Sequence, residues 1–162
     1  MEKIFIVCVD DQPDTLSAVS KDLELFETHC GVEMCESAKE AFALLDELDA
    51  AGDFPAVIIS DHVMPGQTGV EFLAEVEKDK RFDAVRKILL TGLATHQDTV
   101  AAINHARIDH YLEKPWKPET LVQAVKEQLT YFVLRKGLDY QDYAPILDPT
   151  LLLETIHQRG GV

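Results

Sequence analysis

The stretch "VCVDDQP", residues 7–13, completes an apolar run, Ile4–Val9, and follows it with two adjacent carboxylates, Asp10 and Asp11. A short run that is almost wholly apolar is typical of a strand covered on both faces of a parallel sheet. Two acids at the end of such a strand repel each other unless a positive partner lies close by. The stretch therefore predicts a buried strand, and a site at its carboxyl end that recruits positive charge.

Apolar runs alternate with amphipathic segments along the rest of the chain. We expect further strands at residues 32–35, 56–60, 87–91 and 108–112. Helix starts are expected after Pro13, Ser37, Thr68 and Lys117. A shorter helix is expected over 97–106, with Val100 and Ile103 facing inward. Strict alternation of strand and helix predicts the α/β class, as a (βα)5 doubly wound parallel five-stranded sheet with helices on both faces.

Composition narrows the classes of function. The chain has 162 residues and a formal charge of −14, which disfavours direct binding to nucleic acid or to an anionic membrane. No apolar stretch approaches the length of a membrane span. We expect no signal peptide, because only three residues precede the first expected strand at Ile4. Cys8, Cys30 and Cys35 lack metal-ligand spacing, so we expect structural thiols and a cytoplasmic protein.

Polar side chains follow four of the five expected strands. They are Asp10 and Asp11, Asp61, Thr91 and Lys114. Because the carboxyl ends of parallel strands meet at one edge, these side chains are expected on one rim, where three carboxylates favour Mg²⁺, with Mn²⁺ as a substitute. Asp61 precedes a Pro-Gly turn, so we expect an exposed carboxylate that can act as a nucleophile toward phosphorus. Lys114 suits a phosphate oxygen.

Four stretches carry a resemblance to a known family. They are the acidic pair, "DHVMPGQTGVEFL" (61–73), "LLTG" (89–92) and "YLEKPW" (111–116). In this order they resemble the receiver domain of bacterial two-component response regulators, the CheY-like family, over about residues 3–130. The resemblance implies a flavodoxin-like, CheY-like fold. It also implies phosphoryl transfer from a sensor histidine kinase or a phosphotransfer protein.

The resemblance also implies a role for each acid. The position of Asp61 takes the phosphoryl group. The positions of Asp10 and Asp11 hold Mg²⁺ together with Asp61. The Asp11 position binds the metal directly, and the Asp10 position commonly binds it through water. Val63 would lend its backbone carbonyl to the metal.

Three further positions are implied in phosphoryl binding and switching. Thr91 and Lys114 would bind the phosphoryl oxygens, and Tyr111 would turn inward on activation. The surface formed by helix four, strand five and helix five would then change. The Lys114-Pro115 step resembles one that is usually cis, an isomer that proline makes accessible.

Two other functions remain as alternatives. A Mg²⁺-dependent phosphohydrolase with an aspartyl-phosphate intermediate would carry an Asp-x-Asp motif at the end of the first strand. In this chain Gln12 stands two residues after Asp10. A flavin-binding module would need a Ser/Thr/Gly-rich phosphate loop, whereas "DDQPDT" would repel a phosphate. We expect no metabolic enzyme, only catalysis of the chain's own phosphorylation and dephosphorylation. The six histidines share no ligand spacing, and His62 should point away from Asp61.

The C-terminal part exceeds the length of a receiver. We expect a receiver (phosphoacceptor) domain over residues 1–136 and an extension over 137–162, with a short helix after Asp148. Its apolar side chains are Leu138, Tyr140, Tyr143, Ile146, Leu147, Leu152, Leu153 and Ile156. They could pack on their own domain, meet another chain or belong to a linker toward an output domain. We favour a homodimer through the end of helix five and the tail, because no sheet remains there to cover them.

Overall fold

A computed structural model describes residues 3–92, 100 and 104–160 of the chain. Its centre is a five-stranded parallel sheet in the order β2-β1-β3-β4-β5. The strands are β1 (Ile4–Val9), β2 (Gly31–Cys35), β3 (Phe54–Asp61), β4 (Arg86–Thr91) and β5 (His110–Glu113). The doubly wound (βα)5 architecture expected from the sequence is confirmed.

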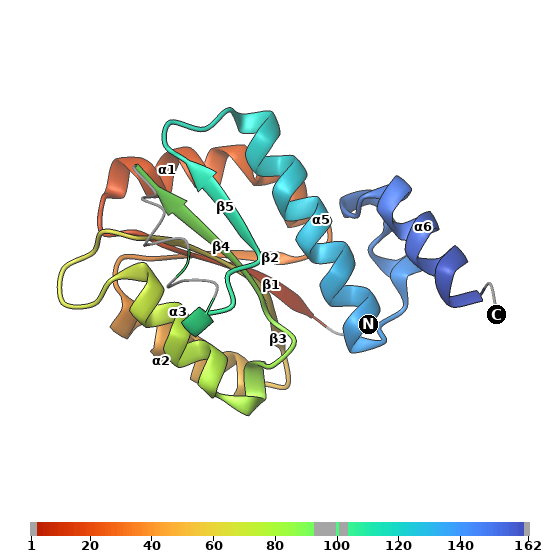
Figure 1. Ribbon diagram of the computed structural model, residues 1–162, viewed down its shortest axis with the longest axis horizontal. Helices are drawn as coiled ribbons and strands as arrows, with labels where there is room; N and C mark the ends of the chain where they lie inside the picture. Colours follow the sequence, from red (N-terminus) through yellow and green to blue (C-terminus); the bar gives the residue numbers. More distant parts are fainter. Residues whose placement is uncertain (1–2, 93–99, 101–103, 161–162) are drawn as a thin grey trace.

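Helices follow the strands in the expected alternation (Figure 1). They are α1 (Pro13–Asp22), α2 (Ala38–Ala50), α3 (Gly69–Lys78), α5 (Pro118–Lys136) and α6 (Pro149–Gly160). Short 3₁₀ helices are η1 (Glu24–Thr28), η2 (Lys80–Phe82), η3 (Tyr140–Asp142) and η4 (Ala144–Ile146). Most of the helix expected over 97–106 lies outside the described residues. Val100, expected to face inward, is described and is 42% exposed, so that expectation was wrong.

The predicted helix ends are confirmed by their hydrogen bonds. Ser37 caps α2 by accepting a hydrogen bond from Glu40 N, at 3.1 Å. Thr68 and Glu71 form a complete capping box at the start of α3. Gly137 ends α5 with φ of 75°, a left-handed conformation that costs glycine little. None of the described helices is long and apolar enough to cross a bilayer.

The sheet separates two apolar layers. Alternate residues of β1 point to opposite faces: Ile4, Ile6 and Cys8 pack with α1 and α5, whereas Phe5, Val7 and Val9 pack with α2 and α3. Figure 1 shows these helix pairs on the two sides of the sheet. Burial on both faces explains why the first strand is an unbroken apolar run. It also leaves the polar residues at the strand ends as the chemically active part of the sheet.

The tail folds back on its own domain. Tyr143, Ile146 and Leu147 are no more than 2% exposed and belong to the same apolar cluster as Phe132 and Val133 of α5. Figure 1 shows α6 alongside the later part of α5. Of the alternatives raised by the sequence, packing on the same chain is therefore the one seen in this structure.

The reason given for a homodimer, an apolar tail left in water, does not hold for these side chains. The homodimer itself stays a prediction. A dimer interface in this region would use large apolar side chains that lie on the surface. Tyr131 and Leu153 are two of these, 38% and 68% exposed.

Candidate functional site

The register of the sheet brings the predicted site residues to one rim. Val9 of β1 lies opposite Ser60 of β3, Asp61 opposite Leu90 of β4, and Thr91 opposite Glu113 of β5. The side chains that follow or end these strands are thus neighbours across the carboxyl edge of the sheet. Ligands of open α/β sheets bind at this edge.

Asp10 is buried, and its two carboxylate oxygens have unequal surroundings. Oδ1 accepts a hydrogen bond from the backbone N–H of Gln12 at 2.8 Å. Oδ2 is buried without a hydrogen bond from any described residue, and the Nζ atom of Lys114 lies 3.7 Å from it. Burial raises the pKa of Asp10, and the nearby charge of Asp61 raises it further, against the opposing effects of Gln12 N–H and Lys114.

Asp61 lies at the centre of the rim. Its carboxylate Oδ1 is 2.6 Å from Nζ of Lys114, a close ion pair between the ends of β3 and β5. The expectation of an exposed carboxylate was wrong, because Asp61 is only 5% exposed. As the last residue of β3, it lies between neighbouring strand ends with the lysine side chain against it.

Three carboxylates converge on one point of this rim. Asp10, Asp11 and Asp61 each offer an oxygen, and these oxygens lie within 4.8 Å of one another. Asp11 is exposed whereas the other two are buried. Oxygens around a Mg²⁺ ion lie about 2.0–2.1 Å from the metal. Together with the unbonded Oδ2 of Asp10, the oxygen-only donor set fits a small divalent cation.

The loop after Asp61 depends on a glycine. The N–H of Gly69 donates to the carbonyl of His62 at 2.8 Å, folding the start of α3 against the end of β3. A Cβ on Gly69 would lie 2.2 Å from the carbonyl oxygen of Asp61. In the same loop the Val63 side chain is 76% exposed. His62, for which no functional role was expected, is half-buried, and its Nδ1 has no hydrogen-bond partner among the described residues.

Thr91, Tyr111 and Lys114 occupy the β4–β5 side of the rim. Thr91 is 5% exposed, and its carbonyl accepts a hydrogen bond from Lys114 N at 2.8 Å. Tyr111 is half-buried against the α2–α3 layer, and burial raises the pKa of its hydroxyl. The peptide bond between Lys114 and Pro115 is cis, as expected.

Sequence reasoning missed three contributors to this site. The backbone N–H of Gln12, the close approach at Gly69 and a hydrogen bond between Trp116 and Asp22 were not assigned roles. The glycine was within reach, since it stands inside the quoted 61–73 stretch. The other two depend on loop geometry, and no residue pattern encodes it.

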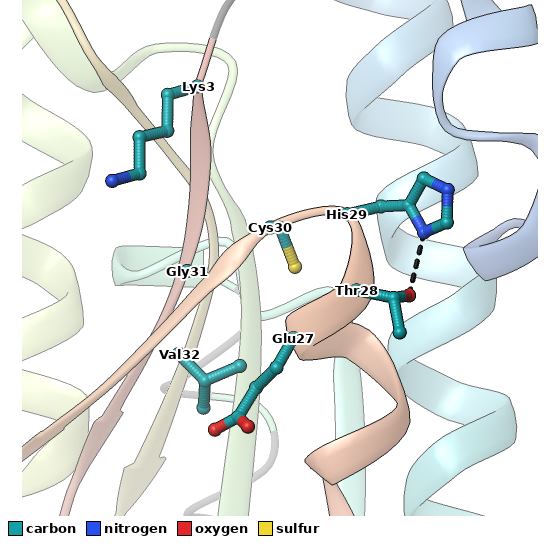
Figure 2. A pocket seen from close by; sticks show the side chains of 7 residues that line it. All are labelled: Lys3, Glu27, Thr28, His29, Cys30, Gly31 and Val32. Atoms are coloured by element: carbon teal, nitrogen blue, oxygen red, sulfur yellow. Dashed lines mark hydrogen bonds between the residues drawn. The ribbon is translucent and has the colours of Figure 1, made fainter.

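A separate hollow of about 570 Å³ lies at the other end of the strands, lined by Lys3 and residues 27–32 (Figure 2). Thr28 Oγ1 and His29 Nδ1 lie 2.6 Å apart there, joined by a hydrogen bond. Burial raises the pKa of Cys30 to about 12, which keeps the thiol protonated at neutral pH. This amino-terminal hollow brings together none of the rim residues.

Comparison with known proteins decides the family. Residues 6–126 match the model of the response regulator receiver domain. The chain belongs to this family. Neither the phosphohydrolase nor the flavin-binding alternative is the family matched.

Several relatives are similar to this receiver. The hydrogenase transcriptional regulatory protein HoxA of Cupriavidus necator is 34% identical over 75% of this chain and 23% of its own length. The response regulator Rre1 of Synechocystis is 30% identical over 79% of this chain and 52% of its own length. A receiver domain protein of Methanospirillum hungatei superposes with a TM-score of 0.70 at 27% identity, covering 83% of this chain and 99% of that one. The chain thus spans about a quarter of the length of HoxA.

Proposed function

We propose that the chain is a phosphorylation-controlled switch in which Asp61 accepts a phosphoryl group. The observation that carries the proposal is the position of its carboxylate, 2.6 Å from Nζ of Lys114 and clustered with Asp10 and Asp11. A carboxylate is a competent nucleophile toward phosphorus. A cation beside it can neutralise charge on the transferring group.

Asp10, Asp11 and Asp61, with the backbone carbonyl of Val63, would hold Mg²⁺ or, in its place, Mn²⁺. When bound, the ion supplies charge neutralisation for the phosphoryl oxygens. The clustered carboxylate oxygens and the unbonded Asp10 Oδ2 support this assignment.

The remaining steps use the chain's own groups. A sensor histidine kinase or a phosphotransfer protein presents a phosphohistidine, and an Asp61 oxygen attacks the phosphorus in line with the P–N bond. That bond breaks, its electron pair returns to the imidazole, and an O–P bond forms on Asp61. Lys114 then pairs with a phosphoryl oxygen. Water later hydrolyses the acyl phosphate, so the chain acts on its own phosphorylation state and is no metabolic enzyme.

Phosphorylation changes the protein surface through Thr91 and Tyr111, on the β4–β5 side of the rim. The Thr91 hydroxyl moves to a phosphoryl oxygen, and the half-buried Tyr111 turns into the space released. This would bias the surface of helix four, β5 and α5 between two states and so control a partner or an output. The charge of −14 supports a protein partner over direct binding to nucleic acid or membrane.

Mass spectrometry after incubation with acetyl phosphate and Mg²⁺ tests the proposal. We expect one phosphoryl group on the wild-type chain and none on Asp61→Asn or in the presence of EDTA. Asp14→Asn, which changes an exposed acid in the first turn of α1, is the control and should be labelled like the wild type. Full labelling of Asp61→Asn would overturn the assignment of the nucleophile.

A further inference from the structure

The single tryptophan of the chain connects the site to α1. Trp116 stands two residues after Lys114 and is half-buried against the apolar cluster shared by α1 and α5. Its indole Nε1 donates a hydrogen bond to Oδ2 of Asp22 at 3.2 Å. Asp22 is the last residue of α1. A contact between residues this far apart in sequence holds a loop to a helix, beyond any local turn.

The segment that Trp116 holds contains the lysine of the site. β5 ends at Glu113 and α5 begins at Pro118, so residues 114–117 form a connector outside both elements. On one side the connector is fixed by Lys114 N, which donates to the carbonyl of Thr91 at 2.8 Å. On the other side it is fixed by the indole on Asp22. The connector is thus held at two points, Lys114 and Trp116.

Both ends of α1 are also tied to this site. Gln12, the residue before α1, donates its N–H to Asp10, and Asp22 at the other end accepts from Trp116. A lysine side chain is long and flexible, and its ammonium is a point charge with many accessible positions. A fixed backbone reduces the number of side-chain conformers in which that charge leaves Asp61. Small displacements of a catalytic group carry large costs in rate.

We propose that Trp116 is a positioning residue, whose hydrogen bond to Asp22 fixes the 114–117 connector so that the Lys114 amine stays on Asp61 and Asp10. The inference rests on the proposed function, since Lys114 is assigned there to the phosphoryl group. This role would connect the rim around Asp61 to the C-terminal end of α1 through the hydrogen bond of Trp116 to Asp22.

The test compares variants that keep the ring or the acceptor with variants that lose them. Trp116→Phe keeps an aromatic ring and loses the N–H, whereas Asp22→Ala loses the acceptor. We expect each to slow phosphorylation by acetyl phosphate about five- to tenfold. The double variant should be no slower than either single one, because both remove the same bond. Asp22→Asn keeps an oxygen acceptor and should restore the rate to within about twofold of wild type.

Dependence on Lys114 separates positioning from a general loss of structure. In a Lys114→Ala background, Trp116→Phe should cause no further loss of rate, because the residue it positions is gone. Tyr140→Phe, a half-buried tyrosine of the tail, serves as the aromatic control and should react at the wild-type rate. A Trp116→Phe variant that reacts at the wild-type rate would overturn the proposal. So would an equal loss in the Lys114→Ala background.

A second readout needs no phosphorylation. Amine acylation, mapped by mass spectrometry, should label Lys114 faster in Trp116→Phe than in wild type, with the exposed Lys39 of α2 unchanged. If the wild-type chain takes no phosphoryl group, the proposed function fails, and the labelling of Lys114 still decides this inference. Equal labelling of Lys114 in both chains would then overturn it.

Discussion

Asp10 and Asp11 are adjacent in sequence but differ in what they can offer a metal. Asp10 is 2% exposed and has one oxygen committed to the N–H of Gln12, whereas Asp11 is exposed. We expect Asp11→Ala to weaken Mg²⁺ affinity by about tenfold or more, equivalent to about 1.4 kcal/mol, and Asp10→Asn to weaken it less. Calorimetric titration measures both, with Asp14→Ala as the exposed control. Equal or reversed effects would show that the geometry of the pair has been assigned wrongly.

The cysteines provide a pH-dependent prediction at the residue scale. Burial raises the pKa of Cys30 and of Cys35 from 9.0 to about 12, and burial also raises that of Cys8. The unfolded chain therefore loses these protons first, so the stability that the thiols contribute is fully present below pH 9 and is lost as pH rises toward 12.

Urea unfolding at neutral pH and at about pH 10 measures this loss. Cys35→Ala should lose less stability between the two conditions than the wild type. A thiol reagent at neutral pH should modify the folded chain far more slowly than the unfolded one. An equal loss in wild type and variant would contradict the burial argument.

Much of the rim could be predicted at the residue scale. A residue at the carboxyl end of a strand in a parallel sheet must lie at the same edge as the residues that end the neighbouring strands. Asp10, Asp61, Thr91 and Lys114 follow from the strands alone once the sheet is parallel. The burial of Asp61 could not be predicted this way, because it depends on the neighbouring strand ends and on the lysine against it.

At the scale of elements, Gly69 determines how closely α3 approaches β3. An added Cβ would lie 2.2 Å from the Asp61 carbonyl oxygen and 2.9 Å from the Cα atom of His62, both of them backbone atoms with little freedom to move. We expect Gly69→Ala to lower the free energy of unfolding by about 2 kcal/mol, as an overpacked site does.

Chemical denaturation measures the effect, with Gly92→Ala as the matched control. A Cβ on Gly92 meets nothing within 4 Å, so its effect should stay within about 0.5 kcal/mol. Similar losses in the two variants would contradict the backbone clash, because an added Cβ meets backbone atoms at Gly69 and nothing within 4 Å at Gly92.

The sequence pattern did not predict where the first α-helix ends or which type of helix follows it. Leu16, Val19, Leu23 and Phe26 fall at helical spacing, yet the α-helix ends at Asp22 and a 3₁₀ helix carries Phe26. All four are buried, so the same apolar spacing is satisfied by either helix type over a short segment. Helix starts were predicted more closely, because Ser37 and Thr68 are specified by side-chain hydrogen bonds.

At the scale of the whole molecule, the tail is tied to α5 by polar contacts as well as apolar ones. Asp148 caps α6 by accepting from Leu151 N at 3.0 Å, and its other oxygen accepts from Nε2 of Gln123 at 2.6 Å. Its own N–H donates to the hydroxyl of Thr130, which is fully buried. The sequence predicted this helix start but left its neighbour open, because an apolar stripe specifies burial without specifying the surface that provides it.

The last prediction follows from the burial of the tail. A chain ending at Lys136 loses Tyr143, Ile146, Leu147 and Leu152, each at most 8% exposed, and uncovers Phe132 and Val133. Each such side chain contributes about 1.5–3 kcal/mol, so the shortened chain should lose several kcal/mol of stability. It should also self-associate through the uncovered face more strongly than the full chain does.

Urea unfolding and light scattering measure the two effects, with a chain ending at Gly160 as the control for shortening. If the full chain were dimeric and the chain ending at Lys136 monomeric, the expected order would be reversed, and the tail would be part of an interface. Leu153→Glu, at a 68% exposed position of α6, would then separate the dimer without disturbing the tail's own packing. A monomeric full chain unaffected by Leu153→Glu would instead leave the tail as an integral cover of α5, extending the folding unit of the receiver beyond Lys136.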